Sequence, residues 1–204
     1  DSNNRGRNFE DEIARIENLR ENFDAFDDIP SLMAIEGNIR EIYYRCFPSI
    51  IQQEIEFERR VMRPPDNMVN AMISFVNSLV YTAVLSEIYR TQLSPLVSYL
   101  HEPGVRRYSL SLDIAEIFKP LLGDRLIFSL LNKRQITSED FDETINFVYL
   151  KDKGRKKVVK EFDERLKTTI KHRKLKRSVS YRKLIRLELY ALIKHLLGES
   201  QYKG

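Results

Sequence analysis

Residues 67–90 read NMVNAMISFVNSLVYTAVLSEIYR, and apolar side chains recur on nearly every side of the helix that this stretch would form. Its polar exceptions include Asn67, Asn70, Ser74, Asn77 and Ser78. A helix that is apolar all round belongs in the interior of a bundle. The stretch therefore predicts an all-α fold, a multi-helix domain built around a helix spanning about residues 67–92.

The composition agrees with a helical globular protein. Of 204 residues, 42% are hydrophobic and 31% are charged, Trp is absent, and Gly and Pro number only seven each. The single cysteine, Cys46, excludes an internal disulfide framework and fits a reducing, cytoplasmic location. We find no apolar run of membrane-spanning length and no signal peptide, so no membrane partner is expected. The chain does not begin with Met, which suggests a fragment or a processed product.

Capping and helix-breaking signals set the other expected elements. Ser31 and Asp66 are expected to cap helices, Pro95 and Gly154 to interrupt them, and Gly198 to end the last one. Further helices are expected over about 8–25, 31–48, 48–60, 95–101, 109–119, 120–131, 138–149, 155–171 and 180–197. We divide the chain into a helical lead-in over residues 1–30 and a helical domain over 31–204.

The charge is unevenly distributed along the chain. Residues 151–204 contain 18 Lys and Arg against 6 Asp and Glu, whereas residues 1–150 contain 16 against 24. A basic region attached to an acidic body suggests an acidic polymer as a partner. The alternative, a solvated Lys-rich helical surface, remains open on charge alone.

Asp113 and Glu116 stand in the otherwise apolar segment 108–116, and a helix would place them three residues apart on one face. Two negative charges in apolar surroundings are costly unless a cation shares them. With His101 and Glu36 they suggest a divalent metal site assembled from three helices. Oxygen ligands with one imidazole suit Mn²⁺ or Mg²⁺. From spacing alone, a solvated helix face and a packing histidine remain alternatives.

A series of short motifs extends these observations. It comprises Ala34-Ile35-Glu36-Gly37, Tyr43-Tyr44, Arg63-Pro64-Pro65, Asn70-Ala71, Ser74-Phe75, Leu100-His101, Ser109-Leu110, Asp113-Ile114-Ala115-Glu116, Lys119-Pro120, Leu150, Gly154-Arg155-Lys156-Lys157, Tyr181-Arg182 and Leu184-Ile185-Arg186. In this order the motifs resemble the CRISPR-associated integrase of the adaptation module, the Cas-one family. The similarity runs from about residue 30 to the end and covers only the family's helical C-terminal domain. The family's N-terminal β-rich domain, which builds its dimer, is expected to be absent from this chain.

The resemblance implies a set of site residues. Glu36, His101 and Glu116 match the family's metal ligands, with Asp113 as the adjacent acidic residue, and these four are the expected catalytic residues. Many family members carry Asp where this chain has Glu116, which offers an equivalent oxygen on a side chain one methylene longer. The implied cofactor is Mn²⁺ or Mg²⁺. Tyr81 matches a tyrosine near the family's DNA strand junction, and simple packing is its alternative.

DNA contacts are expected from the basic residues. We expect Lys156, Lys157, Arg173, Arg177 and Arg182 to contact phosphates without reading sequence. Arg59, Arg60 and Arg63 near the Pro-Pro turn form a second candidate phosphate clamp. Surface ion pairs with Glu54, Glu56 and Glu58 are the alternative for these arginines.

The function implied by the resemblance is CRISPR spacer acquisition, part of antiviral defence. The 3′-hydroxyl of a captured DNA fragment would attack a repeat-end phosphate, and with water as nucleophile the same site would be an endonuclease. The implied partners are DNA, the small second adaptation protein (Cas-two), and a second copy in the full-length protein. The alternatives are a non-catalytic DNA-binding or scaffold domain and a related transposon integrase.

Overall fold

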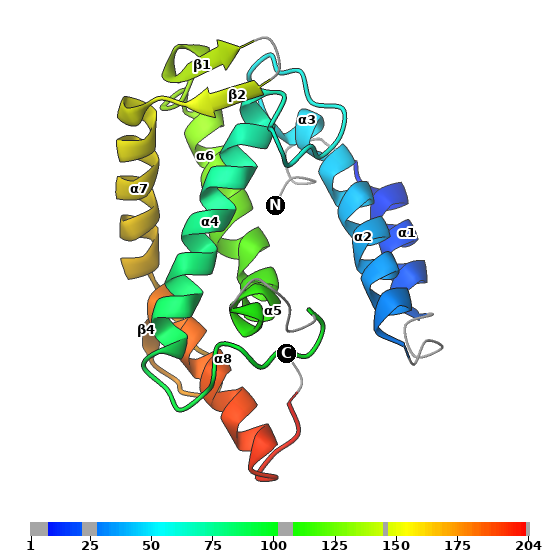
Figure 1. The fold of residues 1–204 in the computed structure, drawn as a ribbon, viewed down its shortest axis with the longest axis vertical. Helices are drawn as coiled ribbons and strands as arrows, with labels where there is room; N and C mark the ends of the chain where they lie inside the picture. Colours follow the sequence, from blue (N-terminus) through cyan, green and yellow to red (C-terminus); the bar gives the residue numbers. More distant parts are fainter. Residues whose placement is uncertain (1–7, 22–27, 102–107, 145–146, 203–204) are drawn as a thin grey trace. The chain divides into compact units, whose positions relative to one another are not determined.

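The structure is a computed structural model that describes residues 8–21, 28–101, 108–144 and 147–202. It is mostly helical with two two-stranded antiparallel sheets, so the expected fold class is confirmed in its coarse form (Figure 1). Contacts divide the chain into two compact units. The first comprises Asp1–Met72 with Leu130–Lys151, and the second comprises Ile73–Ser129 with Asp152–Gly204. The division expected at residue 30 stays a prediction.

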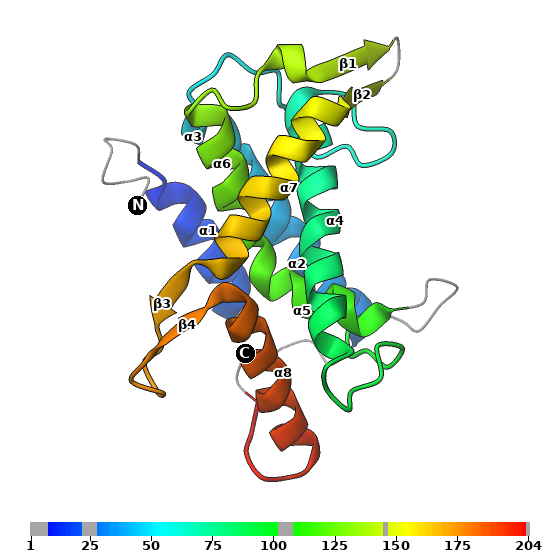
Figure 2. The same cartoon turned by 90° about the vertical axis from the view of Figure 1, so that its left-hand side faces the viewer.

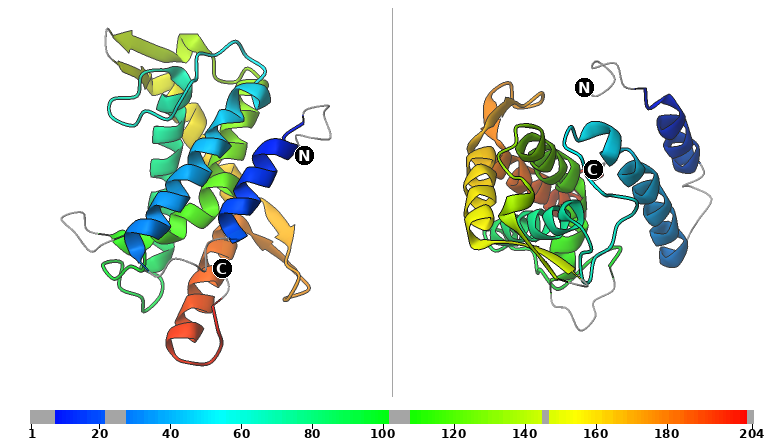
Figure 3. Two further views of the ribbon diagram at one scale, coloured as in Figure 1. Left: turned by 90° about the vertical axis from the view of Figure 1, so that its right-hand side faces the viewer. Right: turned by 90° about the horizontal axis from the view of Figure 1, so that it is seen from above.

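Two helices begin the first unit, and they lie side by side in Figures 1 and 3. They are α1 (Glu10–Glu21) and α2 (Ile29–Arg45), followed by the short α3 (Phe47–Ile50). The cap expected at Ser31 is wrong, because Asp28 caps α2 by accepting a 2.9 Å hydrogen bond from the Ser31 amide. Pro30 sits in the first turn, where its missing N–H costs nothing.

The helix expected over 48–60 ends instead at Ile50. Ile51 is extended, and the following residues bond to a distant part of the same unit. The Gln52 amide donates to Asn132 Oδ1 at 2.7 Å, and Gln53 Nε2 donates to the Ile136 carbonyl at 2.9 Å. These long-range bonds replace the local ones that a helix would have made.

Asn70, which is fully buried, organises the loop that follows. Its amide group donates to the Arg59 carbonyl at 2.9 Å and to Asp66 Oδ1 at 2.7 Å. Its Oδ1 accepts from Arg60 Nη1 at 3.0 Å and from the Val61 amide at 3.2 Å. Burial lowers the pKa of the Arg60 guanidinium. Arg60 is thus a packing residue, whereas Arg59 and Arg63 are exposed on the loop that Asn70 holds.

Residues 138–149 were expected to be helical, and this was wrong. The 3₁₀ turn η4 (Ser138–Asp140) leads into strands β1 (Phe141–Thr144) and β2 (Phe147–Leu150), which pair Phe141 with Leu150. Val148 and Leu150 are buried while Tyr149 is exposed. That alternation has the period of two that a half-buried strand requires.

The long apolar helix α4 (Met68–Ile88) matches the stretch that decided the fold, and most of it belongs to the second unit. Ile73, Val76 and Val84 are fully buried. Asn67, rather than Asp66, caps it, because Asn67 Oδ1 accepts from the Asn70 amide at 2.9 Å. By length and composition alone α4 is long and apolar enough to cross a membrane, which corrects the expectation that no apolar run has this length. Half of its most apolar 18-residue stretch is buried inside the protein.

A helical run of three parts follows, and most of it lies in the second unit. Helix α5 (Ser109–Phe118) continues through the π-helix η3 (Lys119–Asp124) into α6 (Arg125–Asn132). Pro120 therefore widens the run without ending it. A side chain at Gly123 would come within 3.4 Å of Val76, so this glycine lets η3 approach α4 closely.

The end of the chain forms a helix, a hairpin and a helix. Helix α7 (Asp152–Lys167) precedes strands β3 (Thr169–Lys171) and β4 (Ser178–Ser180), and α8 (Tyr181–Leu196) follows. The break expected at Gly154 is wrong, because Gly154 lies buried within α7. The start expected near residue 180 and the end signal at Gly198 are confirmed, because Ser180 caps α8 and Gly198 has φ of 74°. The hairpin replaces the last residues of the helix expected over 155–171.

A buried ion pair joins α4 to α8. Glu87 is fully buried, and its Oε2 lies 2.7 Å from both Nε and Nη2 of Arg186. The carboxylate raises the pKa of the Arg186 guanidinium. Arg90 and Arg182 lie farther from Glu87 Oε1, at 3.7 and 3.9 Å.

Replacing Arg186 by Leu should destabilise the protein by about 3 kcal/mol, because it leaves a buried carboxylate without its main partner. The double variant Glu87→Leu/Arg186→Leu should recover most of this loss, since apolar residues can replace a buried pair at little cost. Urea unfolding of both variants measures the difference. A double variant as unstable as the single one would contradict this account of the pair.

Candidate active site

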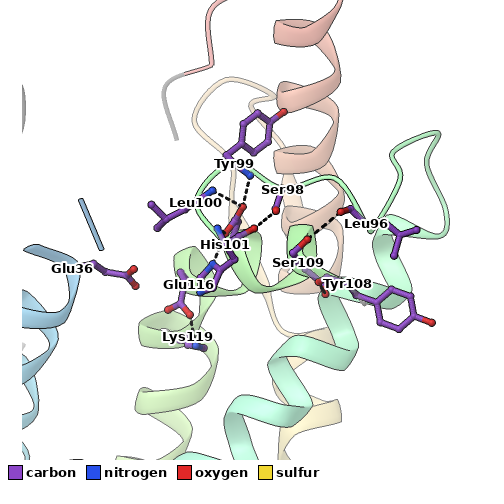
Figure 4. A network of polar contacts seen from close by, with 12 residues as sticks. Glu36, Leu96, Ser98, Tyr99, Leu100, His101, Tyr108, Ser109, Glu116 and Lys119 are labelled. Atoms are coloured by element: carbon purple, nitrogen blue, oxygen red, sulfur yellow. Dashed lines mark hydrogen bonds and ion pairs between the residues drawn. The ribbon is translucent and has the colours of Figure 1, made fainter. Parts of the chain in front are cut away.

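The segment before His101 is a loop, not the helix expected over 95–101. The reason is that the backbone N–H groups of this segment donate to a side chain on another element and not to carbonyls within a helix. Asp113, on α5, accepts from the Tyr99 amide at 2.8 Å and the Leu100 amide at 3.2 Å through Oδ2, and from the His101 amide at 3.2 Å through Oδ1 (Figure 4). Three successive N–H groups thus converge on one carboxylate. His101, the expected histidine ligand, therefore lies on a loop and not on a helix.

Asp113 also holds the His101 ring. Asp113 Oδ1 lies 2.5 Å from His101 Nδ1, and the Asp113 side chain is only 10% exposed. A carboxylate can only accept, so the proton of the imidazole lies on Nδ1. This leaves Nε2 with its lone pair as the ring atom available to a metal ion or to a proton. Ser98 donates its hydroxyl to the His101 carbonyl, which adds a further tie to the loop.

Glu116 lies one turn along α5 from Asp113. The two carboxylates are three residues apart and leave the same face of the helix. Because His101 is bonded to Asp113, His101 and Glu116 lie on one face of α5 (Figure 4). Neither carboxylate is in the first turn, which contains no acidic residue. The dipole at the N-terminus of α5 therefore adds little to the stability of either negative charge.

Lys119 was given no role from the sequence. In the structure its ammonium contacts Glu116 Oε1, and both side chains are largely buried, at 17% and 19% exposed. The spacing of three residues on a helix is the signal that could have indicated this pair. The Lys119 cation offsets the charge of Glu116 in partly apolar surroundings.

Glu36 lies on α2 in the first unit, where its Oε1 accepts from Arg40 Nε at 2.9 Å. Its convergence with His101 and Glu116 stays a prediction. Over the described residues, no group of three or more His, Cys, Asp or Glu side chains is arranged to hold a metal ion within either unit. The predicted set takes members from both units, so neither unit could complete it alone.

The donor set itself fits a hard divalent cation. The ring nitrogen left by Asp113 is a neutral imidazole ligand of fixed orientation, and the Glu116 carboxylate supplies oxygen. Glu116 already attracts a cation, the Lys119 ammonium. These residues therefore suit Mn²⁺ or Mg²⁺ better than structural zinc.

The expected DNA-binding residues fall into three situations. Arg59, Arg63, Lys156, Arg173 and Arg177 are exposed. Tyr81 and Lys157 are half-buried. Arg182 is held between acidic groups, with Nη2 3.5 Å from Asp163 and Nη1 3.9 Å from Glu87. Arg182 therefore has a structural role in addition to any contact with DNA, which stays a prediction for all of these residues.

Comparison with known proteins identifies the family. The family model for CRISPR associated protein Cas1 matches residues 1–164, and a CRISPR-associated endonuclease Cas1 of Fusobacterium nucleatum is 55% identical over 202 residues. The chain belongs to the Cas1 family. A Cas1 endonuclease of Thermodesulfovibrio yellowstonii is 58% identical over 85% of the chain. The chain spans 60% and 54% of the lengths of these two relatives.

Solved structures agree with this assignment. A CAS1 protein from Thermotoga maritima superposes with a TM-score of 0.85 at 46% identity, over 92% of this chain and 59% of that one. A casposase bound to integration product shares the fold, with a TM-score of 0.79 at 24% identity over 86% of this chain and 50% of that one. The family resemblance drawn from the motifs is thus confirmed.

The Asp113–His101 contact predicts the tautomer of the ring. Nitrogen NMR of the wild-type chain should show His101 protonated at Nδ1 and unprotonated at Nε2 when the ring is neutral. In Asp113→Asn the amide can turn its NH₂ toward the ring, so the population should shift toward the Nε2-protonated form. The other two histidines, His172 and His195, serve as internal controls. An unchanged tautomer in Asp113→Asn would contradict the positioning role of Asp113.

Proposed function

We propose that this chain is the catalytic part of a CRISPR adaptation integrase, which joins the 3′-hydroxyl of a captured DNA fragment to a repeat-end phosphate. The observation that carries the proposal is the Asp113-held His101 on the same face of α5 as Glu116. Membership of the Cas1 family and the endonuclease names of its relatives support it.

His101, Glu116 and Glu36 would hold Mn²⁺ or Mg²⁺. When bound, such an ion neutralises a non-bridging phosphate oxygen and stabilises the leaving oxygen. The chain's own contribution is orientation. Asp113 fixes the loop and the ring of His101, so that Nε2 faces the site without rotational freedom, and small misplacements at such a site cost large factors in rate.

The chemistry is a transesterification. The attacking 3′-oxygen forms a new bond to phosphorus as the bond to the leaving 3′-oxygen breaks, and one proton passes from the attacking hydroxyl to the leaving oxygen through solvent. The number of phosphodiester bonds is unchanged, so no external energy source is required. No protein nucleophile is needed, and Cys46, a half-buried thiol whose pKa is raised by burial, takes no part.

The proposed partners are DNA, the small second adaptation protein and a second copy in the full-length protein, in the cytoplasm. Similarity to a casposase bound to integration product and to a Cas6-RT-Cas1–Cas2 complex supports the first two. The basic residues of α7 provide a sequence-independent path for phosphates. Arg59 and Arg63 are proposed as a further phosphate clamp, and Tyr81 as a contact near the strand junction.

His101→Ala should abolish joining while DNA binding persists, because one neutral ligand is lost and the basic surface is intact. Glu36→Ala and Glu116→Ala should behave in the same way. The assay measures joining of a labelled fragment to repeat DNA with Mn²⁺, in this chain and in the full-length context of a relative. Chelation of the metal should stop wild-type joining, and added Mn²⁺ should restore it.

Manganese binding to the 204-residue chain, followed by electron paramagnetic resonance, gives an independent readout. Binding should weaken in each of the three variants and remain in the control variant Glu139→Ala, an exposed acidic position. Wild-type joining by His101→Ala would overturn the role of His101 as a metal ligand. DNA binding without joining by wild type would favour the alternative of a non-catalytic DNA-binding domain.

A further inference from the structure

The β3–β4 hairpin projects from the junction between α7 and α8 (Figure 2). Ile170 pairs with Val179. At the base of the hairpin the amide of Tyr181, the first residue of α8, donates a 3.1 Å hydrogen bond to the carbonyl of Thr168, which follows α7. Val179 is buried at the base. The hairpin is therefore a fixed extension of the second unit.

The tip of the hairpin is also ordered by its own bonds. The His172 amide donates to the Arg177 carbonyl at 2.9 Å, and the Lys176 amide donates to the His172 carbonyl at 3.0 Å. The Leu175 amide donates to His172 Nδ1 at 3.2 Å, and Lys176 adopts a positive φ of 54°. Residues 173–176 are thus presented in one conformation.

The charge of the hairpin is uncompensated. Between Glu164 and Glu188 the sequence contains no acidic residue. Five cations of the hairpin are exposed, and within the described part of the chain none of them is ion-paired: Lys171, Arg173, Lys174, Lys176 and Arg177. By contrast, Arg165, Arg182 and Arg186 on the adjoining helices are all bonded or ion-paired internally. A dense, unpaired set of cations on a rigid support suits a polyanion.

The form of the polyanion follows from what the tip contains. Residues 171–178 include no Phe, Tyr or Trp, so the tip lacks the aromatic surface on which single-stranded bases stack. A two-stranded ribbon has the width that enters the major groove of B-form DNA, which is about 12 Å wide. Leu175, 40% exposed, stands among the cations and can make the apolar contact that base edges accept.

We propose that the β3–β4 hairpin is a duplex-binding ribbon that enters the major groove, with Arg173, Lys174, Lys176 and Arg177 contacting the flanking phosphates. This proposal rests on the proposed function for the identity of the polymer, DNA. It adds which element binds the duplex, the β3–β4 hairpin, and which groove the hairpin enters. The choice of the element and of the groove depends on the geometry and charge of the hairpin.

The test removes the four tip cations in Arg173→Gln/Lys174→Gln/Lys176→Gln/Arg177→Gln and measures duplex binding across a salt series. Each lost phosphate contact lowers the slope of log affinity against log salt by about 0.9, so the slope should fall by about 2 to 4. Binding to single-stranded DNA should change much less. The matched control Arg15→Gln/Arg20→Gln/Lys133→Gln/Arg134→Gln removes the same charge from exposed positions of the first unit and should leave the slope within about 1 of wild type.

A second measurement addresses the groove. Duplex DNA whose cytosines carry glucosylated 5-hydroxymethyl groups has its major groove filled, since the 5-position projects there. This duplex should bind wild type as weakly as plain duplex binds the hairpin variant, and should not weaken the variant further. Equal binding of both duplexes by wild type would overturn groove entry, and an unchanged salt slope in the hairpin variant would overturn the ribbon altogether.

The outcomes for the hairpin and for catalysis are separable. If wild type joins DNA and the hairpin variant binds duplex normally, the ribbon is wrong and the integrase proposal stands. If the hairpin variant loses duplex binding but wild type never joins DNA, the ribbon stands and the catalytic proposal falls.

Discussion

The candidate site depends on the capture of three backbone N–H groups and one imidazole by the Asp113 carboxylate. Ordering a loop residue costs about 1–2 kcal/mol. Hydrogen bonds to a charged group contribute about 1.5–3 kcal/mol each. With four contacts on one carboxylate, the gain is enough to fix residues 99–101 without secondary structure. The loop can then differ in sequence on its outer side, where Tyr99 is exposed, without loss of the geometry at His101.

The second unit divides its cations between two uses. Arg165 donates from Nε and Nη2 to the Leu121 carbonyl of η3 and lies over the Tyr181 ring, and Arg186 neutralises the buried Glu87. Burial removes water from the Arg165 guanidinium and thereby lowers its pKa. These arginines join helices, whereas those of the hairpin carry charge outward. A basic composition alone does not distinguish the two uses, because the difference lies in which cations find a buried acceptor.

Local signals predicted the parts of this fold that local physics decides. The apolar run of α4, the start of α8 near residue 180 and Gly198 at its end were all predicted correctly, since each depends on neighbouring residues. The helices expected over 48–60 and 95–101 were wrong because polar groups of these segments bond elsewhere in the chain. Gln52 and Gln53 bond to residues about 80 positions away, and residues 99–101 bond to Asp113. The caps expected at Ser31 and Asp66 were wrong for a local reason, since the neighbouring Asp28 and Asn67 cap instead. At the site, the spacing of Asp113 and Glu116 placed both on one face, but nothing in the sequence marked Asp113 as the partner of His101.

Glu116 and Lys119 show how the same chain manages a site with concentrated negative charge. Two carboxylates on one face of α5 would repel each other and a DNA phosphate alike. The Asp113 carboxylate accepts hydrogen bonds from backbone amides and contacts the ring of His101. The Glu116 carboxylate pairs with the ammonium of Lys119, the first residue of η3. The π-helix is a frequent feature of functional sites because it widens the helix locally. Here it carries Lys119 and Pro120 at the point where α5 ends. The charge on Glu116 is thereby balanced by the fold itself, and a divalent cation at this carboxylate would take over a role that Lys119 already fills.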